Sequence, residues 1–461
     1  MVYDVILIGE CPGGYNAALE GAKHQLKTMV IETNFIGGTC LKEGCIPTKI
    51  LLKSAEVLET VKSATSFGVT TEKLTYDHGI TIERKNKLVQ QLNKGVLGNL
   101  KKAQVEIMQG FGELVGRESG FIHVACDGEV YRTKHVIRAT GSSPMLPKIE
   151  RLGEASAKQF VLNSTQLLNA LELPEKLVIV GGGVVGIEMA EVFHKLGVEI
   201  EILEFQPTIG GVIDTDLAVA MRTMLEKRGI KVVTGAIVSK FSHSVVEYVH
   251  NGQTCKTAAS KVLISTGRKG NIDAISLDKL GIETERGFIQ TNDFCATNSP
   301  NIYAIGDVNG KSLLAHTAYR EAEVAIQAIL GNKERMNYNA IPSVIYTSPE
   351  MASVGLTAEQ AATEGIDVKI IKVPLIYSGR FLIEESNTNS FLKVIIEKRY
   401  NKIVGMHLFA PFASEIIFGM TILVEQEMRI KDLKRIVLAH PSIAEILKEV
   451  VTIYEMEEAL A

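Results

Sequence analysis

The chain has 461 residues, which at about 150 residues per domain predicts roughly three domains and excludes a single small module. Apolar residues make up 46% and charged residues 22%, and this composition excludes a disordered or fibrous chain. The formal net charge is −4 and no block of like charge stands out, so we expect no nucleic-acid partner.

The first predicted element is an apolar strand that starts near residue 3 and runs into a glycine-rich turn. Residues 4–14, DVILIGECPGG, align with residues 176–186, KLVIVGGGVVG, and a helical pattern follows each turn. The next strand ends in a glutamate in both places, Glu32 and Glu204, 23 residues after the first glycine of its turn. This repeat predicts two βαβ nucleotide-binding units.

The second turn has the complete pattern Gly181-x-Gly183-x-x-Gly186. Its glycines permit a tight turn, close approach of a pyrophosphate, and packing of helix on strand. Glu204 is spaced to accept hydrogen bonds from a ribose 2′-hydroxyl and would repel a 2′-phosphate, so we expect NAD(H) rather than NADP(H).

The first turn, Gly9-x-Cys11-x-x-Gly14, has a cysteine where the second glycine belongs. A cysteine there has a Cβ near the pyrophosphate and is strained if its backbone is left-handed. Two interpretations stay open: weakened binding of a dinucleotide, or a turn that tolerates Cys11. Glu32 and a later turn at Gly306 and Asp307 support a second dinucleotide site, and two such sites in one chain suggest a flavin reduced by a nicotinamide.

Cys40 and Cys45 are the only close pair among six cysteines. Their C-x4-C spacing differs from that of a zinc knuckle, and we expect no metal. On a regular helix the two residues point apart, so a disulfide requires a distorted helix, for which Gly44 and Pro47 provide the means. Redox chemistry is favoured over the alternative of two buried thiols.

The remaining segments predict that the chain returns to the first domain and then forms a third domain of a different fold. Residues 136–142 and 262–268 read as short strands that leave each nucleotide-binding unit, and a turn at Gly306 and Asp307 precedes a helix over about 313–330. Beyond residue 339, strands at 343–347, 368–374 and 391–397 and helices near 412–427 and 441–457 predict an α+β domain.

Residues 37–49, GGTCLKEGCIPTK, resemble the redox-active motif of the FAD-dependent pyridine nucleotide-disulfide oxidoreductases, and within them of the dihydrolipoamide dehydrogenases. The resemblance covers essentially the whole chain. It extends over residues 139–141, 186–188, 265–268, 297–307, 314–316, 341–350 and 440–445.

The resemblance implies an α/β fold with two Rossmann-like domains, for FAD and NAD, and a carboxyl-terminal α+β dimerisation domain. The expected boundaries are 1–150 for the first part of the FAD domain, 151–272 for the NAD domain, 273–342 for the second part of the FAD domain, and 343–461 for the dimerisation domain. It further implies a homodimer that oxidises protein-bound dihydrolipoamide to lipoamide with NAD⁺, as the shared component of a 2-oxo acid dehydrogenase or glycine cleavage complex.

The resemblance also implies roles for individual residues. Cys40 would be the interchange thiol and Cys45 the thiolate that faces the flavin. His440 would be the base, held by Glu445, and Lys49 and Glu188 would pair beside the flavin ring. The expected FAD-binding residues are Gly9, Cys11, Gly13, Gly14, Glu32, Gly38, Thr39, Lys49, Thr140, Gly141, Ser142, Gly306, Asp307, Ala315 and His316. The expected NAD-binding residues are Gly181, Gly183, Gly186, Glu188, Glu204 and Gly267.

Two other functions remain open: a related NAD(P)H-dependent reductase of another disulfide, and a flavin-deficient structural or binding subunit. The amino end lacks a basic signal segment, and no apolar run approaches the roughly 18 residues of a membrane span. We therefore expect no membrane association and a cytoplasmic protein, or a mitochondrial matrix protein if the chain is a mature organellar form. The flavin strand begins at residue 3, so we expect the lipoyl group on a separate protein.

Overall fold

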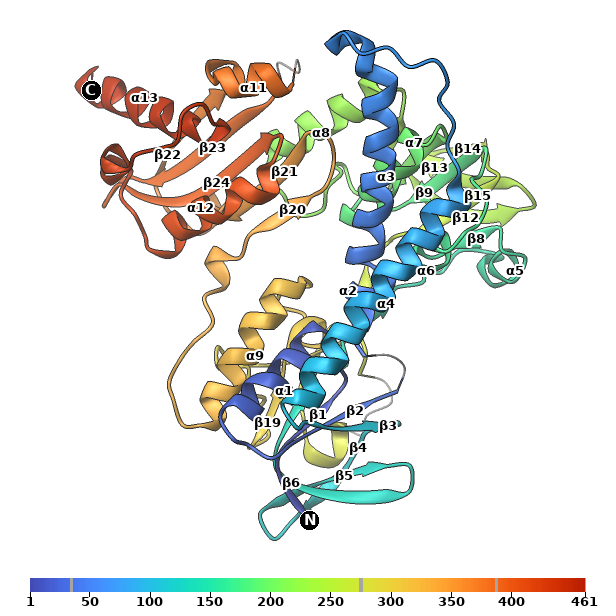
Figure 1. The fold of residues 1–461 in the computed structure, drawn as a ribbon, viewed down its shortest axis with the longest axis vertical. Coiled ribbons are helices and arrows are strands. Elements are labelled where there is room, and N and C mark those ends of the chain that lie inside the picture. Colours follow the sequence, from blue (N-terminus) through green and yellow to red (C-terminus); the bar gives the residue numbers. More distant parts are fainter. Residues whose placement is uncertain (34–35, 273–276, 386–388, 461) are drawn as a thin grey trace. The chain divides into compact units, whose positions relative to one another are not determined.

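The computed structural model describes residues 1–33, 36–272, 277–385 and 389–460. Its internal contacts divide the chain into two compact units (Figure 1). Unit 1 comprises Met1–Lys148, Leu162–Leu173 and Ile264–Met336, and unit 2 comprises Ile149–Val161, Pro174–Leu263 and Asn337–Ala461. The finer division at residues 150, 272 and 342 remains a prediction.

Unit 1 is built on a seven-stranded sheet of order β3-β2-β1-β6-β5-β4, with β19 paired to β6. β3, β2, β1, β6 and β19 run parallel, while β4 and β5 form an antiparallel extension. Val5 to Ile8 are all buried, as expected of a parallel strand that is covered on both faces. The strands are β1 (Val2–Ile8), β2 (Thr28–Glu32), β3 (Glu106–Gln109), β4 (Glu113–Glu118), β5 (Phe121–Cys126), β6 (Glu129–Arg138) and β19 (Ile302–Ala304).

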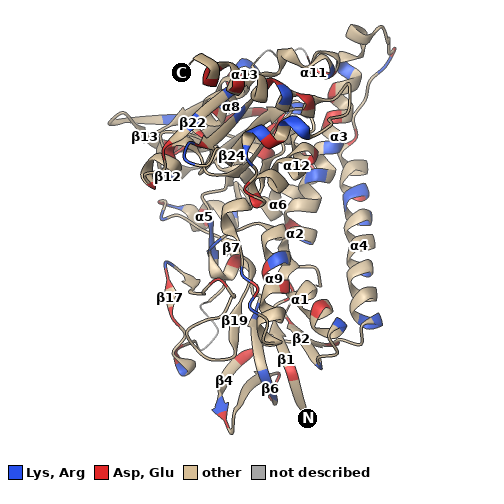
Figure 2. Cartoon of the chain, turned by 90° about the vertical axis from the view of Figure 1, so that its left-hand side faces the viewer, with Lys and Arg blue, Asp and Glu red and all other residues tan. Residues whose placement is uncertain are grey.

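Helices α1 and α9 pack against each other beside this sheet. Small buried residues of α1, among them Ala17 and Gly21, allow the close approach, and a Cβ on Gly21 would lie 3.5 Å from Ile326 Cδ1 of α9. Lys and Arg residues are spread along α4 (Figure 2). The helices of unit 1 include α1 (Pro12–Lys23), α2 (Gly38–Glu43), α3 (Cys45–Ser63), α4 (His78–Lys102), α6 (Ser164–Leu168) and α9 (Ala315–Ile329).

Short strands complete unit 1. β7 (Ser142–Pro144) pairs antiparallel with β16 (Arg268–Gly270), and β17 (Thr284–Glu285) pairs with β18 (Phe288–Ile289). The predicted strands 136–142 and 262–268 overlap β6 and β15 (Lys261–Ile264), and β7 and β16 begin at their last residues, Ser142 and Arg268.

The second nucleotide-binding repeat forms a five-stranded sheet of order β11-β10-β9-β15-β8. β9, β10 and β11 run parallel, and α7 follows the glycine-rich turn after β9. A separate three-stranded sheet has the order β12-β13-β14. The elements are α5 (Leu152–Ala157), β8 (Val161–Leu162), β9 (Lys176–Val180), α7 (Val184–Lys195), β10 (Glu199–Glu204), α8 (Thr215–Lys227), β11 (Lys231–Thr234), β12 (Ile237–Ser242), β13 (Val245–His250), β14 (Gln253–Ala258) and β15 (Lys261–Ile264).

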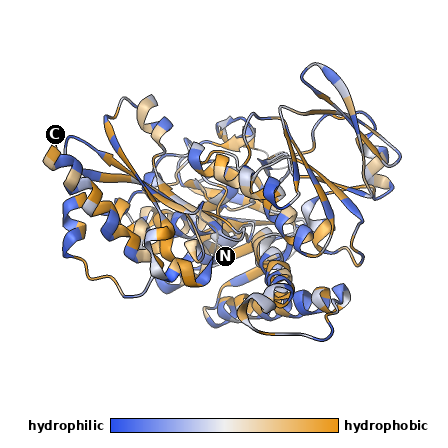
Figure 3. Ribbon diagram, turned by 90° about the horizontal axis from the view of Figure 1, so that it is seen from above, coloured by the Kyte–Doolittle hydropathy of each residue, from blue (hydrophilic) through white to orange (hydrophobic). Residues whose placement is uncertain are grey.

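The carboxyl-terminal part of unit 2 is an antiparallel sheet of order β20-β21-β24-β23-β22, packed against α12 and α13. Apolar residues run along the strands and helices (Figure 3). Two predicted strands have the expected bounds, whereas the central strand β24 was not predicted. The elements are β20 (Ser343–Ile345), β21 (Glu350–Gly355), α10 (Ala358–Thr363), β22 (Val368–Pro374), α11 (Gly379–Glu384), β23 (Phe391–Glu397), β24 (Lys402–Ala410), α12 (Ala413–Glu425) and α13 (Ile446–Leu460).

Together these sheets and helices confirm the predicted fold class. Among the helices of the described residues, none is long and apolar enough to cross a membrane.

Candidate active site

The first glycine-rich turn needs glycine at its first and last positions. Gly9 has a φ of +94°, and a Cβ there would lie 2.4 Å from the Ala139 carbonyl oxygen. A Cβ on Gly14 would lie 2.3 Å from the Gly9 carbonyl oxygen. Gly13 is less crowded, since its Cβ would lie 3.1 Å from Ile305 Cδ1. The turn therefore brings the end of β1 against residue 139 and leads directly into α1.

Cys11 adopts an ordinary extended backbone at this turn. It is the N-cap of α1 with φ −61° and ψ 173°, so the left-handed strain considered from the sequence is absent, because an extended N-cap accommodates any side chain. Its side chain lies against the neighbouring turns: a Cβ on Gly141 would be 2.6 Å from Cys11 Sγ, and one on Gly38 would be 2.7 Å from Cys11 Cα. Burial, together with the charges of Asp307 and Glu32, raises the pKa of the Cys11 thiol to about 12. Cys11 is therefore a neutral thiol near pH 7.

The glutamate at the end of each nucleotide-binding repeat accepts a hydrogen bond from the backbone of its own glycine-rich turn. Glu32 Oε2 accepts the Glu10 N–H at 2.7 Å, and Glu204 Oε2 accepts the Gly182 N–H. A carboxylate oxygen has two lone pairs, so both carboxylates can also accept from ribose hydroxyls. The two repeats therefore share the same hydrogen bond between the glutamate side chain and the backbone of the turn, which supports the predicted repeat.

A cavity of about 420 Å³ lies within unit 1 at the ends of β1, β2 and β6. Seven of the residues predicted to bind FAD line it, namely Gly9, Cys11, Glu32, Gly38, Thr39, Thr140 and Ser142. It is also lined by residues that were not predicted, including Ile8, Ile31, Lys42, Gly110, Gly112, Arg138 and Asn271. The volume lies in the range of ligand sites, and the lining combines apolar walls with a few polar groups.

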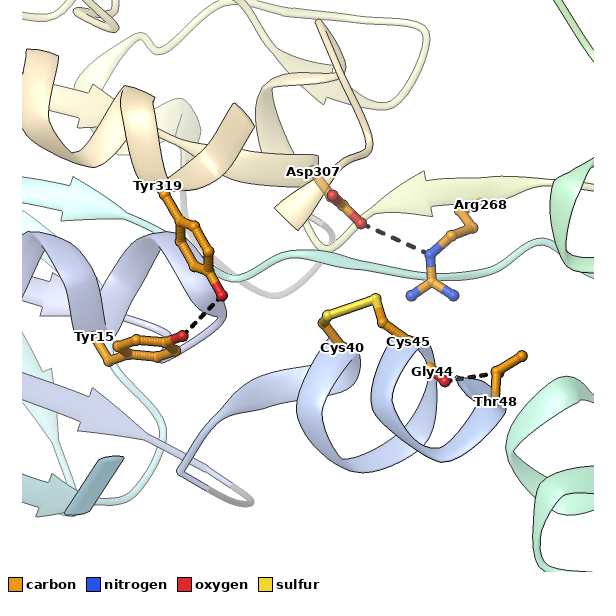
Figure 4. Close-up of a disulfide and its surroundings, with 8 residues drawn as sticks. All are labelled: Tyr15, Cys40, Gly44, Cys45, Thr48, Arg268, Asp307 and Tyr319. Atoms are coloured by element: carbon orange, nitrogen blue, oxygen red, sulfur yellow. Dashed lines mark hydrogen bonds and ion pairs between the residues drawn. A yellow bond between two sulfur atoms is a disulfide. The ribbon is translucent and has the colours of Figure 1, made fainter. Parts of the chain in front are cut away.

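The other residues predicted to bind FAD lie on neighbouring elements of unit 1. Gly141 and Gly306 have φ values of +67° and +70°, a conformation that favours glycine. Ser142 donates a hydrogen bond to Asp307 and accepts one from Arg268 Nε at 2.7 Å. Arg268 Nε also lies 3.8 Å from Asp307 (Figure 4). Ala315 and His316 are the first two residues of α9.

Cys40 and Cys45 form a disulfide, with their Cα atoms 4.7 Å apart. The helix is interrupted at Gly44, whose φ of −139° and ψ of −102° end α2 and start α3 (Figure 4). The Gly44 carbonyl accepts hydrogen bonds from the Thr48 backbone and hydroxyl at 3.0 and 2.7 Å. The predicted distortion is therefore a complete break between two helices, and it places Cys45 at the positive end of α3.

His440 and Glu445 form a pair in unit 2. His440 Nδ1 lies 2.9 Å from Glu445 Oε1, and Glu445 Oε2 accepts the Ser442 N–H at 2.9 Å. The Ser442 hydrogen bond and His440 together lower the pKa of Glu445. The carboxylate thus favours the tautomer with a proton on Nδ1 and leaves Nε2 as the basic nitrogen. The His440 side chain is 81% exposed.

The second glycine-rich turn has the geometry that its sequence predicts. Gly181 has a φ of +109°, Gly183 is the extended N-cap of α7, and Gly186 is buried at the start of that helix. Gly267, also predicted to bind NAD, has a φ of +114° and belongs to unit 1.

Lys49 lies on α3 of unit 1 and Glu188 on α7 of unit 2. Glu188 is buried and accepts the Tyr346 N–H at 3.2 Å. The predicted pairing of Lys49 with Glu188 joins different units and remains a prediction.

Comparison with known proteins identifies the family. Residues 3–322 match the pyridine nucleotide-disulphide oxidoreductase family, and residues 341–451 match the dimerisation domain of that family. The chain belongs to the pyridine nucleotide-disulphide oxidoreductases. This membership confirms an enzyme with a dimerisation domain, and FAD and NAD as its cofactors.

Relatives of this oxidoreductase match over nearly its whole length. The dihydrolipoyl dehydrogenases of Bacillus subtilis and Thermus scotoductus are each 36% identical, covering 97% of this chain and 97% and 96% of their own lengths. Among solved structures, LpdA from Mycobacterium tuberculosis has a TM-score of 0.88 at 24% identity, covering 97% of this chain and 99% of its own, which supports the fold. The flavoprotein disulfide reductase RclA from Escherichia coli has a TM-score of 0.84 at 25% identity, with coverages of 98% and 99%.

The unit 1 cavity of this oxidoreductase fits a flavin dinucleotide. The amino end of α1 is suited to a pyrophosphate, and the Glu32 carboxylate is suited to ribose hydroxyls. Gly38 and Gly141 lack the Cβ atoms that would collide with Cys11 at this turn. Cys11 lines the cavity, and its backbone keeps an ordinary extended conformation.

Two charged residues of the oxidoreductase were missed by the sequence reasoning. Glu10, in the first turn, and Arg138, at the end of β6, are both completely buried. The available signal was a charge inside an otherwise apolar or glycine-rich segment, ILIGECPGG for Glu10 and VIRATG for Arg138.

Proposed function

We propose that this oxidoreductase oxidises protein-bound dihydrolipoamide to lipoamide with NAD⁺. The observation that carries the proposal is the Cys40–Cys45 disulfide, which lies directly after Gly38 and Thr39 of the cavity wall. The dihydrolipoyl dehydrogenases at 36% identity support this substrate.

The sulfur chemistry follows from the positions of the two cysteines. A substrate thiolate attacks Cys40 Sγ, the Cys40–Cys45 bond breaks, and Cys45 leaves as a thiolate. Cys45 is the first residue of the 19-residue helix α3, whose positive end stabilises that thiolate. The second substrate thiolate then attacks the substrate sulfur of the mixed disulfide, which closes lipoamide and releases Cys40.

Each attack needs a thiolate, so a base must remove the thiol protons. We assign this role to His440 Nε2, because Glu445 occupies the Nδ1 side. In the proposed homodimer, His440 of the partner subunit serves Cys40. Glu445 is a positioning residue that holds the imidazole and stabilises its protonated form.

Bound FAD would accept the two electrons of the dithiol and pass them as hydride to NAD⁺. The proposed FAD site is the unit 1 cavity with Gly9, Glu32, Gly38, Thr39 and Thr140. The proposed NAD site is the second turn, where Gly181, Gly183 and Gly186 would approach the pyrophosphate and Glu204 the ribose. Lys49 and Glu188 are proposed to pair beside the flavin ring.

The remaining parts of the proposal concern assembly. The lipoyl-bearing partner is a subunit of a 2-oxo acid dehydrogenase or glycine cleavage complex, and the proposed compartment is the cytoplasm. We retain the domain boundaries 1–150, 151–272, 273–342 and 343–461 as part of this proposal.

The test is NADH formation from dihydrolipoamide and NAD⁺. We expect Cys45→Ser to abolish it, while NADH-driven reduction of an artificial electron acceptor continues, since that reaction bypasses the disulfide. Cys255→Ser, a half-buried cysteine of β14, is the matched control and should keep both activities. Full dihydrolipoamide turnover by Cys45→Ser would contradict the mechanism.

The similarity to RclA favours a second candidate, a reductase of another disulfide. The same assay run in reverse with lipoamide, glutathione disulfide and coenzyme A disulfide separates the two. If NADH is oxidised faster with glutathione disulfide or coenzyme A disulfide than with lipoamide, that disulfide would become the proposed substrate in place of dihydrolipoamide. A colourless protein without bound flavin would instead support a structural subunit.

A further inference from the structure

Arg138 is a buried arginine at the carboxyl end of β6. In the parallel register its neighbours are Ile8 of β1 and Ala304 of β19, and these pairs share one face of the sheet. Ile8 and Ala304 belong to an apolar cluster on that face. None of the Arg138 side chain is exposed to solvent.

Within the described part of the chain, two nitrogen atoms of the Arg138 guanidinium lack hydrogen-bond partners. Its Nε and Nη1 atoms are buried and have no hydrogen-bond partner among the residues that the structure describes. Burial lowers the pKa of Arg138 to about 9, which still leaves the group charged near pH 7. An unpaired buried charge costs several kcal/mol, so an acceptor for these N–H groups is missing.

Two other buried charged residues in the chain each lie beside a residue of opposite charge. Glu191 is completely buried and pairs with Lys195 Nζ at 3.0 Å and with Arg228 Nη1 at 2.9 Å. Buried Lys393 lies 2.8 Å from buried Asp214. Arg138 differs from both because no carboxylate of the described residues forms an ion pair with its guanidinium.

Arg138 also lines the unit 1 cavity. Ile8 and Ile31 lie on the same sheet face and line the cavity too, and the connection from β3 to β4 contributes Gly110 and Gly112. This wall belongs to the ends of β1, β2 and β6, where Glu32 and the amino end of α1 are suited to the ribose and pyrophosphate of a dinucleotide.

We propose that Arg138 is a cofactor-binding residue whose guanidinium donates hydrogen bonds to acceptor atoms on the ADP half of the bound flavin dinucleotide. The acceptors are phosphate oxygens or purine ring nitrogens, and both kinds occur on ADP. This inference rests on the proposed flavin site in unit 1 and is independent of the dithiol substrate.

The test compares the wild-type holoenzyme with Arg138→Met, which keeps an unbranched side chain but removes every donor. Flavin release on dilution, followed by fluorescence, gives the FAD dissociation constant. We expect it to rise by about 10- to 100-fold, as for loss of a hydrogen bond from a charged group. Arg132→Met, an exposed arginine of the same strand, is the matched control and should leave the constant unchanged.

Displacement of FAD from the holoenzyme locates the contact. The substitution should weaken the binding of ADP and of FAD by the same factor. ADP should therefore displace FAD from Arg138→Met at the same ADP concentration as from the wild-type protein. Riboflavin lacks the whole ADP half and should displace FAD at a concentration lower by the same factor as the loss of FAD affinity. If riboflavin loses affinity in parallel with FAD, the contact lies on the flavin half and the proposal is overturned.

The remaining outcomes are also decisive. Equal FAD dissociation constants for wild type and Arg138→Met would overturn the role of Arg138 and leave the flavin site intact. A wild-type protein that binds neither FAD nor ADP would overturn the flavin site itself. If Arg138→Met fails to fold, Arg138→Leu removes the donors with a shorter apolar side chain, and a wild-type FAD constant for that variant would overturn the proposal.

Discussion

Glu10 is completely buried, and both its carboxylate and its backbone N–H form hydrogen bonds near the first glycine-rich turn. Its Oε2 accepts the Gly37 N–H at 2.9 Å, and its own backbone N–H donates to Glu32. Burial and the charge of Glu32 raise the pKa of the Glu10 carboxyl to about 8, although the Gly37 hydrogen bond opposes the shift. Glu10 is therefore mostly protonated near pH 7.

This shift predicts a pH-dependent contribution of Glu10 to stability. An unfolded glutamate has a pKa of about 4.3, so between that pH and about 8 the unfolded state has released a proton that the folded state still holds. The contribution of Glu10 is fully present below the unfolded pKa and falls as pH rises, by about 1.4 kcal/mol per pH unit. Glu10→Gln keeps an acceptor for Gly37 and removes this loss.

We expect the Tm of Glu10→Gln to rise relative to wild type as the pH increases from 5 to 8. Thermal unfolding at several pH values measures the difference, and Glu83→Gln, an exposed glutamate of α4, controls for the loss of one carboxylate. A Tm difference that stays constant across this range would show that Glu10 is ionised in the folded protein.

At the scale of elements, reactive groups lie where helices begin or are interrupted. Gly44 separates α2 from α3 and so brings the Cα atoms of Cys40 and Cys45 to 4.7 Å, which an uninterrupted helix does not allow. His440 precedes the short turn Ile443–Glu445 that leads into α13, and this turn holds the carboxylate against Nδ1.

This geometry predicts different effects for the two members of the histidine pair. His440→Ala should lower dihydrolipoamide turnover by about 10²- to 10⁴-fold, because a positioned acid–base group is lost. Glu445→Gln should have a smaller effect and shift the pH profile of turnover, since it acts through the imidazole. NADH-driven reduction of an artificial acceptor should be unchanged in both variants, and a loss below tenfold in His440→Ala would remove His440 from this role.

At the scale of the whole molecule, a buried ion cluster ties the segments of unit 2 together. Lys393 of β23 lies 2.8 Å from Asp214 and 2.7 Å from Asp216, both at the start of α8. Burial alone would lower the pKa of Lys393, but its hydrogen bonds to the two aspartates raise it. The lysine therefore stays charged and joins α8 to the carboxyl-terminal sheet.

Lys393→Met should destabilise the protein by about 3–5 kcal/mol, because it leaves the buried Asp214 without a counter-charge. For a unit of this size we expect the Tm to fall on the order of 10 °C. Lys369→Met is the control, because Lys369 pairs with half-exposed Glu457 and Glu458, and such pairs contribute less than about 1 kcal/mol. Equal Tm losses in the two variants would argue against a special role for the cluster.

The sequence by itself determined the features that depend on local spacing. The two glycine-rich turns, the glutamates that follow them and the strands at 368–374 and 391–397 are encoded by residues that are neighbours along the chain. The paired cysteines and their distorting glycine are equally local, so the Cys40–Cys45 disulfide was predictable.

Only the tertiary structure decided the environment of single side chains. The unstrained backbone of Cys11, the protonated carboxyl of Glu10 and the unpartnered nitrogens of Arg138 all depend on segments that are distant in the sequence. Gly37, for example, donates a hydrogen bond to Glu10, and strands β1 and β19 lie on either side of Arg138. A pKa or an unsatisfied donor is set by burial and by charges from other elements, and these long-range contacts leave no local pattern in the sequence.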